Sequence, residues 1–147
     1  LMAITSTITD AFKRDLLKGV HTFATSGGNT FKLALYTSGA TLNASTASYI
    51  TANEASGTNT YSAGGGALTV SASTPTVSSN VGFVDFSDLT FASETITARG
   101  CLIYNDTATG NNTVAAIDFG SNKSSSAGNF TIAFPTASSG AAIIRIA

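Results

Sequence analysis

The sequence predicts a mainly β protein: an antiparallel, jelly-roll-like β-sandwich preceded by one N-terminal amphipathic α-helix. Short apolar segments after residue 30 are separated by Gly, Ser, Asn and Pro, as in proteins built from many short strands. No helical periodicity lies between these segments, so the crossover helices of a parallel sheet are missing. We therefore expect an N-terminal arm at residues 1–20 and a single β-sandwich domain at residues 21–147.

The expected helix spans Ile4–Val20. Its apolar side chains recur every four residues and would form one face of the helix. Seven or eight strands can close a sandwich without this face, so we expect it to pack between subunits or against a sheet edge near a neighbouring chain. Packing on its own domain is the alternative. The candidate interface residues are Ile4, Ile8, Phe12 and Leu16.

The strands are expected in sequence order after the turn that follows this helix. The first, Phe31–Thr37, alternates apolar and more polar residues. The polar stretch Ser38–Gly66 is expected to be a surface excursion. Further strands are expected at residues 67–73, 81–86, 94–105, 113–119, 129–134 and 141–147.

The strand at 94–105 contains the only cysteine, Cys101, and we expect this residue to be packed rather than reactive. A nucleophilic cysteine needs a helix N-terminus or a base to lower its pKa. His21 is the only histidine, and nothing in the sequence marks it as such a base. With a period of two, Cys101 would lie opposite a face formed by Ile96, Ala98, Gly100, Leu102 and Tyr104.

Composition limits the remaining functions. Charged residues make up 10% of the chain and the net charge is −1, which gives no field to attract nucleic acid. No apolar run is long enough to span a membrane. One cysteine and one histidine cannot form a zinc cluster, and Asp85, Asp88 and Glu94 lack the alternating ligands of a calcium loop. We expect a non-enzyme with no catalytic residue, no cofactor and no metal.

The low charge also suggests that much of the surface faces other proteins. We expect a homo-oligomer, with a trimer favoured if the chain sits on symmetric sites. The N-terminal segment "LMAITST" lacks the basic and apolar regions of a signal peptide. A single cysteine cannot form an internal disulfide, so we expect synthesis in a reducing cytoplasm.

Several strings resemble a family of small virion structural proteins of tailed bacteriophages. They are "FKLALYTSGATLNASTASY", "TANEASGTNTYSAGGGALTV", "ITARGCLIYND" and "AAIDFGSNKSSSAGNFTIAFP", followed by "AIIRI". The resemblance covers nearly the whole chain and implies a particle component with no active site and no cofactor.

Two placements in the particle agree with this resemblance. One is a capsid decoration (cement) protein bound to the major capsid protein, and the other is a tail or head–tail protein bound to other virion proteins. In either case the expected location is the virion, after synthesis in the host bacterial cytoplasm. A carbohydrate-binding β-sandwich is a further alternative, although the chain has no Trp to form a sugar platform.

Overall fold

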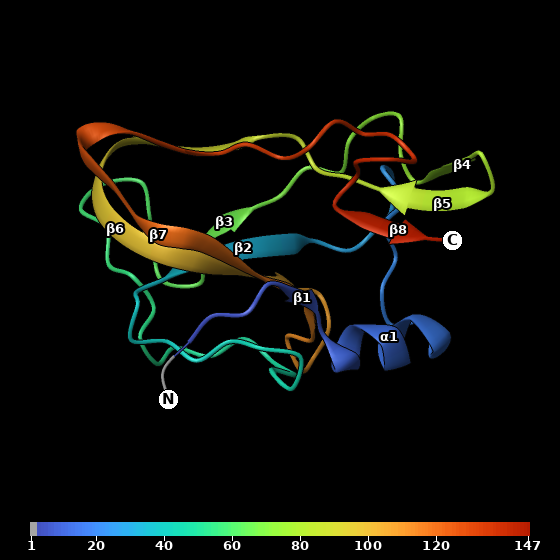
Figure 1. Cartoon of the computed structure of the whole chain (residues 1–147), viewed down its shortest axis with the longest axis horizontal. Coiled ribbons are helices and arrows are strands. Elements are labelled where there is room, and N and C mark those ends of the chain that lie inside the picture. The colour runs from blue at the N-terminus through green and yellow to red at the C-terminus, as the bar shows by residue number, and fades with distance from the viewer. Residues whose placement is uncertain (1–2) are drawn as a thin grey trace.

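The computed structural model describes residues 3–147, which form two antiparallel sheets and one helix (Figure 1). The larger sheet has the strand order β1-β7-β6-β2-β3, and the smaller has the order β4-β5-β8. The prediction of a mainly β fold is confirmed. The strands are β1 (Thr7–Ile8), β2 (Phe31–Tyr36), β3 (Gly66–Ala67), β4 (Thr76–Ser78), β5 (Val81–Val84), β6 (Leu89–Asn105), β7 (Thr113–Ile132) and β8 (Ile144–Ile146), and the helix is α1 (Asp10–Leu17).

The two longest strands, β6 and β7, form one hairpin that curls back over the larger sheet (Figure 1). Ala98 pairs with Lys123, whereas Gly100 pairs with Asp118, so two steps along β6 correspond to five along β7. Extra residues in one strand of a pair bend that strand. Gly120 lies in the extra segment with φ of 80°, a conformation that glycine adopts without strain. The bend encloses the main core.

This bulge also decides which β6 side chains face the main core. Ile96 and Ala98 lie in that core together with Cys101, whereas Leu102 lies in a second apolar cluster. The expectation that Ile96, Ala98 and Leu102 share one face is therefore wrong. Strict alternation is interrupted between Ala98 and Gly100, and every later residue of the strand changes side.

The larger sheet is covered on both faces, which explains why β2 is buried at nearly every position. The curled hairpin covers one face. The irregular segment at residues 38–65 covers the other, where Leu42 is fully buried and packs with Ala34 and Tyr36 in the second cluster. The expected surface excursion is thus a packed cover for the sheet rather than a free loop.

Hydrogen bonds to Glu54 connect several parts of this cover. Its carboxylate accepts hydrogen bonds from the hydroxyls of Tyr49 at 2.5 Å and Tyr61 at 2.7 Å. It also accepts the backbone N–H of Gly64 at 2.7 Å. The Tyr61 hydroxyl in turn accepts the N–H of Leu35 at 2.8 Å, which joins the cover to β2.

Glu94 fastens the cover to the curled hairpin. Its carboxylate is fully buried and accepts the backbone N–H groups of Thr58, Asn59 (3.0 Å) and Tyr61 (2.8 Å). Removal from water by itself raises the pKa of Glu94. The N–H groups of Tyr61, Thr58 and Asn59 stabilise the charged form more strongly and lower the pKa to about 2.

The helix is shorter than the expected Ile4–Val20 and begins only at Asp10. Thr9 is its N-cap, with a hydroxyl that accepts the N–H of Phe12 at 3.2 Å. Before Thr9 the chain is extended, because β1 pairs with β7 and Ile4 forms a bridge with Leu42. β-Branched residues favour such extended pairing, and the sheet takes up backbone groups that the first helical turn would leave unpaired.

The arm expected at residues 1–20 packs on the remainder of the chain. Residues 1 and 2 lie outside the described residues. Ile4 and Phe12 are buried among side chains that come from residues 21–147. The domain boundary at residue 20 stays a prediction.

Candidate functional site

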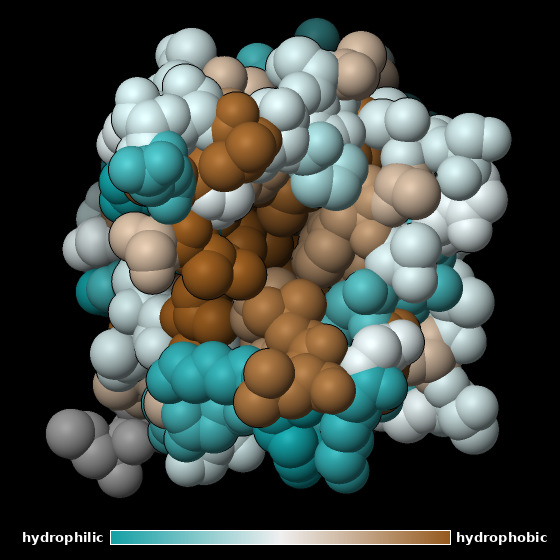
Figure 2. Space-filling model, turned by 90° about the vertical axis from the view of Figure 1, so that its right-hand side faces the viewer, coloured by the Kyte–Doolittle hydropathy of each residue, from teal (hydrophilic) through white to brown (hydrophobic). Residues whose placement is uncertain are grey.

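An apolar groove lies between α1 and the three-stranded sheet β4-β5-β8. It has a volume of about 210 Å³. Phe12 and Leu16 of α1 line it together with Phe23, and Val84 and Ile144 line it from the sheet. Figure 2 shows apolar residues gathered in a hollow on this side of the molecule, with hydrophilic residues around it.

The sheet side of the groove contains a notch. The register places Val77, Gly82 and Ile146 in one row across β4, β5 and β8. Directly opposed residues share a face, and a Cβ added to Gly82 would meet no atom closer than 3.9 Å. Val77 is 68% exposed and Ile146 is 59% exposed. Two exposed apolar side chains therefore flank an open space.

A third exposed apolar residue lies on the neighbouring helix. Leu17 follows the groove residue Leu16 and is 92% exposed. Within residues 3–147, Leu17, Val77 and Ile146 are the large apolar side chains that are exposed. Scattered single apolar residues are normal on a surface, whereas a group around a hollow is typical of an interaction site.

The four candidate interface residues do not form one face. The structure brings Phe12 and Leu16 together in the groove. Ile8 belongs to β1 and is half-buried against the main core, and Ile4 lies in the second cluster. Their role in an interface stays a prediction.

Sequence reasoning missed the sheet half of the groove. The alternation of Ile144 and Ile146 around Arg145 marks two residues of one strand face. Nothing local connects Val77 or Gly82 with them, because the row exists only through the pairing of β4, β5 and β8.

The charged side chains of α1 are mostly paired with one another. Asp10 pairs with Lys13 at 3.1 Å, and Asp15 pairs with Arg14 at 2.8 Å. The hydrogen bond from Arg14 lowers the pKa of Asp15 against the opposing effect of burial. Lys18, at the C-cap of α1, has no carboxylate within 4.0 Å among the described residues.

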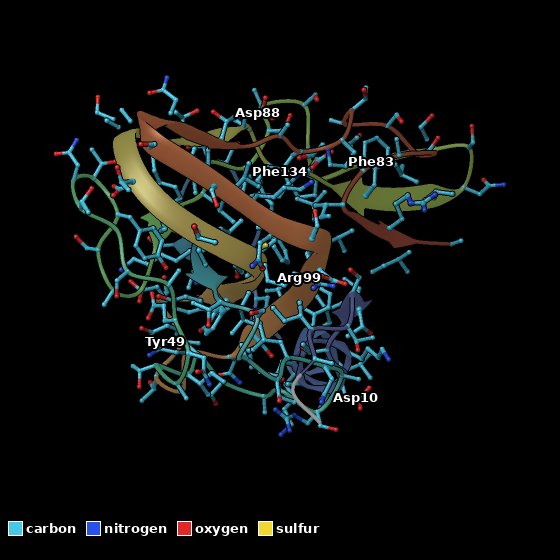
Figure 3. The ribbon with its side chains drawn as sticks, turned by 60° about the vertical axis from the view of Figure 1, so that its left-hand side comes forward. Asp10, Tyr49, Phe83, Asp88, Arg99 and Phe134 are labelled. Atoms are coloured by element: carbon cyan, nitrogen blue, oxygen red, sulfur yellow. The ribbon has the colours of Figure 1, made fainter. Side chains whose placement is uncertain are left out.

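The acidic residues considered as a calcium site are dispersed. Asp85 is buried and accepts the N–H of Phe86 at 2.9 Å, whereas Glu94 is held by the 58–61 segment. Asp88 accepts the N–H of Phe134 at 2.8 Å, and Figure 3 shows both residues in the upper part of the molecule. In the described part of the chain, no group of three His, Cys, Asp or Glu side chains is placed to hold a metal.

His21 packs in an aromatic setting. Its ring centroid lies 5.2 Å from that of Phe12, and its Nδ1 lies 3.1 Å from the amide nitrogen of Asn105. Burial lowers the pKa of His21, an effect that Asp15 partly opposes. The geometry is that of a packed side chain.

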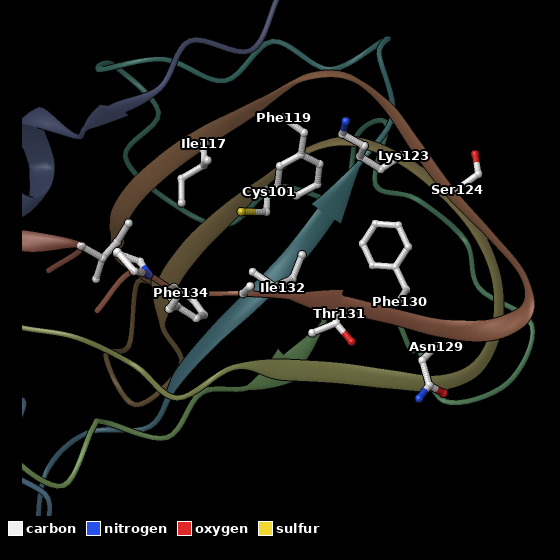
Figure 4. Close-up of a pocket in the computed structure, with 13 residues that line it drawn as sticks. Cys101, Ile117, Phe119, Lys123, Ser124, Asn129, Phe130, Thr131, Ile132 and Phe134 are labelled. Atoms are coloured by element: carbon white, nitrogen blue, oxygen red, sulfur yellow. The ribbon is translucent and has the colours of Figure 1, made fainter. Parts of the chain in front are cut away.

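A larger apolar hollow lies inside the bend of the curled hairpin (Figure 4). Its volume is about 520 Å³, and Cys101 lies at its base with no exposed surface. Burial raises the pKa of the Cys101 thiol to about 12. The remaining apolar lining comprises Ile117, Phe119, Phe130, Ile132, Ala133, Phe134, Pro135 and Ile143, of which Ala133 and Pro135 are exposed and the others half-buried or buried.

We expect Cys101 to react with an aromatic disulfide reagent on the order of a hundredfold more slowly in the folded protein than in urea, because the thiolate is the reactive form. Absorbance of the released thiol measures the rate at pH 8. Cys101→Ser, which leaves no thiol, is the blank. Fast labelling without urea would show that reagent reaches the base of the hollow.

Within residues 3–147, no helix is both long and apolar enough to cross a membrane. Comparisons of the chain with protein-family models, with curated proteins and with solved structures found no match.

Proposed function

We propose that this protein is a structural component of a tailed-phage particle and that it acts through protein–protein contacts. The observation that carries the proposal is the groove: apolar residues from α1 and from the sheet β4-β5-β8 line it, and exposed apolar residues flank it. The strings that resemble phage virion proteins support the same class. The specific role proposed is capsid decoration, in which the chain stabilises the head shell by binding the major capsid protein.

Many identical copies suit this role. Contacts that are weak one by one hold a layer of subunits firmly when they are repeated. The jelly-roll-like sandwich and the homotrimer expected from the sequence are part of the proposal. They are supported by the two antiparallel sheets and by the low charge of the chain.

The test uses purified particles of the phage whose genome encodes this chain. We expect mass spectrometry to find the chain in the particles and electron cryo-microscopy to place it in many copies on the outer head shell. Density for the chain on the tail instead would favour the tail placement and contradict decoration. Absence of the chain from purified particles would overturn the whole proposal.

A further inference from the structure

We infer that the larger hollow inside the bend of the curled hairpin, the hairpin hollow, binds a fatty-acid-like molecule. The hydrocarbon chain of the ligand lies in the hollow and its carboxylate lies beside Lys123. The hairpin hollow shares no lining residue with the groove between α1 and β4-β5-β8. The inference goes beyond the proposed function and does not rest on it, so absence of the chain from phage particles would not contradict it.

The hairpin hollow has the size and the lining of a site for one small apolar molecule. Its volume of about 520 Å³ lies within the range of about 300–1,000 Å³ that is usual for small-molecule sites. Because β7 is bent, Ile117 and Phe119 line the hollow from one side, and Phe130 and Ile132 line it from another (Figure 4). An apolar ligand between these side chains would remove apolar surface from water on both sides.

Among the described residues that line the hairpin hollow, Lys123 is the one that carries a charge. The register pairs Lys123 with Ala98, which is fully buried in the main core. Directly opposed residues share a face of the sheet, so the Lys123 side chain lies on the inner face of the bend. Figure 4 shows it on the same side of the hollow as Phe119. Lys123 is exposed, so its charge lies at the open rim.

Lys123 has no anionic partner in the described chain. No carboxylate lies within 4.0 Å of its ammonium group in residues 3–147. The neighbouring Ser124 lies on the outer face, where its hydroxyl contacts that of Thr97 at 2.7 Å. A cation beside an apolar surface is stabilised when an anion pairs with it, and here that anion has to come from another molecule.

A second copy of the chain has no carboxylate side chain to spare for Lys123. All eight Asp and Glu residues lie in residues 3–147, and each already interacts with a group of its own chain. Four form ion pairs and four accept hydrogen bonds: Asp10, Asp15, Asp106 and Asp118 in the first set, and Glu54, Asp85, Asp88 and Glu94 in the second. A separate small carboxylate pairs with Lys123 without breaking any of these contacts.

A hydrocarbon chain also suits the hairpin hollow better than a peptide does. A peptide backbone brings N–H and C=O groups, which need hydrogen-bond partners once they leave water. The side chains of Ile117, Phe119, Phe130 and Ile132 offer no such partners. A fatty acid has a single polar group at one end, which stays at the rim beside Lys123, where water still reaches it.

The test titrates the full chain with saturated fatty acids of increasing length, from octanoate to tetradecanoate, below their micelle concentrations. Isothermal titration calorimetry measures the affinity. We expect saturable binding, with about a fourfold gain in affinity for each added CH₂ until the hollow is full. Longer acids should then gain no more, because the extra length stays in water. The amide resonances of Ile117, Phe130 and Ile132 should shift with the same midpoint.

Lys123→Met tests the role of the charge, because it keeps the length of an exposed side chain. We expect it to weaken decanoate binding about two- to fivefold, the usual contribution of an exposed ion pair. Decylammonium should bind the parent more weakly than decanoate, and this difference should vanish in the variant. The matched control is Lys18→Met, which removes the same charge outside the hollow and should bind as the parent does.

Ile117→Phe tests the location by reducing the free space. Ile117 is half-buried and pairs with Cys101, which lies at the base of the hollow. We expect the affinity for fatty acids to level off at a shorter chain than in the parent. The matched control is Val77→Phe, which adds a ring to an exposed position outside the hairpin hollow and should leave the series unchanged. Circular dichroism checks that each variant folds, and Lys123→Met decides if Ile117→Phe does not.

The inference is overturned if no fatty acid binds in a saturable way, or if the resonances that shift lie outside the hairpin hollow. It is also overturned if Lys123→Met binds decanoate as the parent does. In that case the inward lysine serves only to keep the free edge of β7 from pairing with another strand. Equal weakening by Lys18→Met would attribute the effect to net charge and contradict the site. Concentration-dependent shifts of the same resonances without ligand would identify a second copy as the occupant and likewise overturn the inference.

Discussion

Replacement of Phe12 by alanine is expected to lower the free energy of unfolding by about 3–5 kcal/mol, the usual cost of truncating a buried phenylalanine. The Phe12 side chain is 2% exposed. Its ring centroid lies 5.2 Å from that of His21 and 6.0 Å from that of Phe23. The total free energy of unfolding of a domain is about 5–15 kcal/mol, so the expected loss is a large part of it. Urea unfolding followed by circular dichroism measures the change.

Leu17→Ala is the matched control for this experiment. Leu17 lies on the same helix and is 92% exposed, so its removal should change stability by no more than about 0.5 kcal/mol. If Phe12→Ala behaves like this control, Phe12 is not part of the domain's core.

Deleting residues 3–18 tests the boundary at residue 20. Because Ile4 and Phe12 are buried against the rest of the chain, we expect the shortened protein to lose its cooperative unfolding transition.

The second large effect is expected at Glu94. Glu94→Gln keeps the shape of the side chain but replaces one accepting oxygen with an amide donor that faces backbone N–H groups. The N–H groups of Asn59 and Tyr61 then lose part of their partner inside the protein. We expect the thermal midpoint at pH 7 to fall by several degrees. Release of the 58–61 segment should appear as faster amide hydrogen exchange there.

The same carboxylate gives the protein a specific acid sensitivity. The pKa of Glu94 is about 2 in the folded chain, against an ordinary value of 4.5, so the folded state favours the charged form. A lowered pKa contributes stability that is fully present above pH 4.5 and is lost as the pH falls toward 2. Urea unfolding at a series of pH values should show this loss in the parent and a flatter profile in Glu94→Gln.

Asp10→Asn is the control for the acid experiment. Asp10 forms an exposed ion pair with Lys13, and such pairs contribute at most about 1 kcal/mol. Its pH profile should therefore follow that of the parent. A parent whose stability does not change between pH 4.5 and 2 would show that the buried hydrogen bonds do not favour the charged form of Glu94.

The sequence by itself determined the features that depend on neighbours along the chain. The alternating segment Phe31–Thr37 predicted β2, and the segment around Cys101 predicted the C-terminal part of β6 and a packed cysteine. A Gly that follows basic residues marks the C-terminal end of a helix. The helix end near Gly19, with φ of 70°, agrees with this rule.

The tertiary structure alone decided the features that depend on pairing between distant segments. Ile4 and Ile8 continue the four-residue spacing that leads to Phe12, as residues of one helix would. Their segment nevertheless pairs with β7 and with Leu42. The sequence spacing is the same in both cases, and the difference lies in backbone hydrogen bonds to partners about forty or more residues away, which local periodicity does not encode.

The groove depends on the same kind of pairing. Phe12, Gly82 and Ile146 come from three parts of the chain and meet only because β5 pairs with β8 and α1 lies against them. The bulge after Ala98 shifts the register and places Cys101 in the main core. The alternation of residues along β6 does not predict this shift. A sequence pattern fixes which side chains alternate along a strand, whereas register, bulges and the meeting of separate elements are set by the free energy of packing the whole chain.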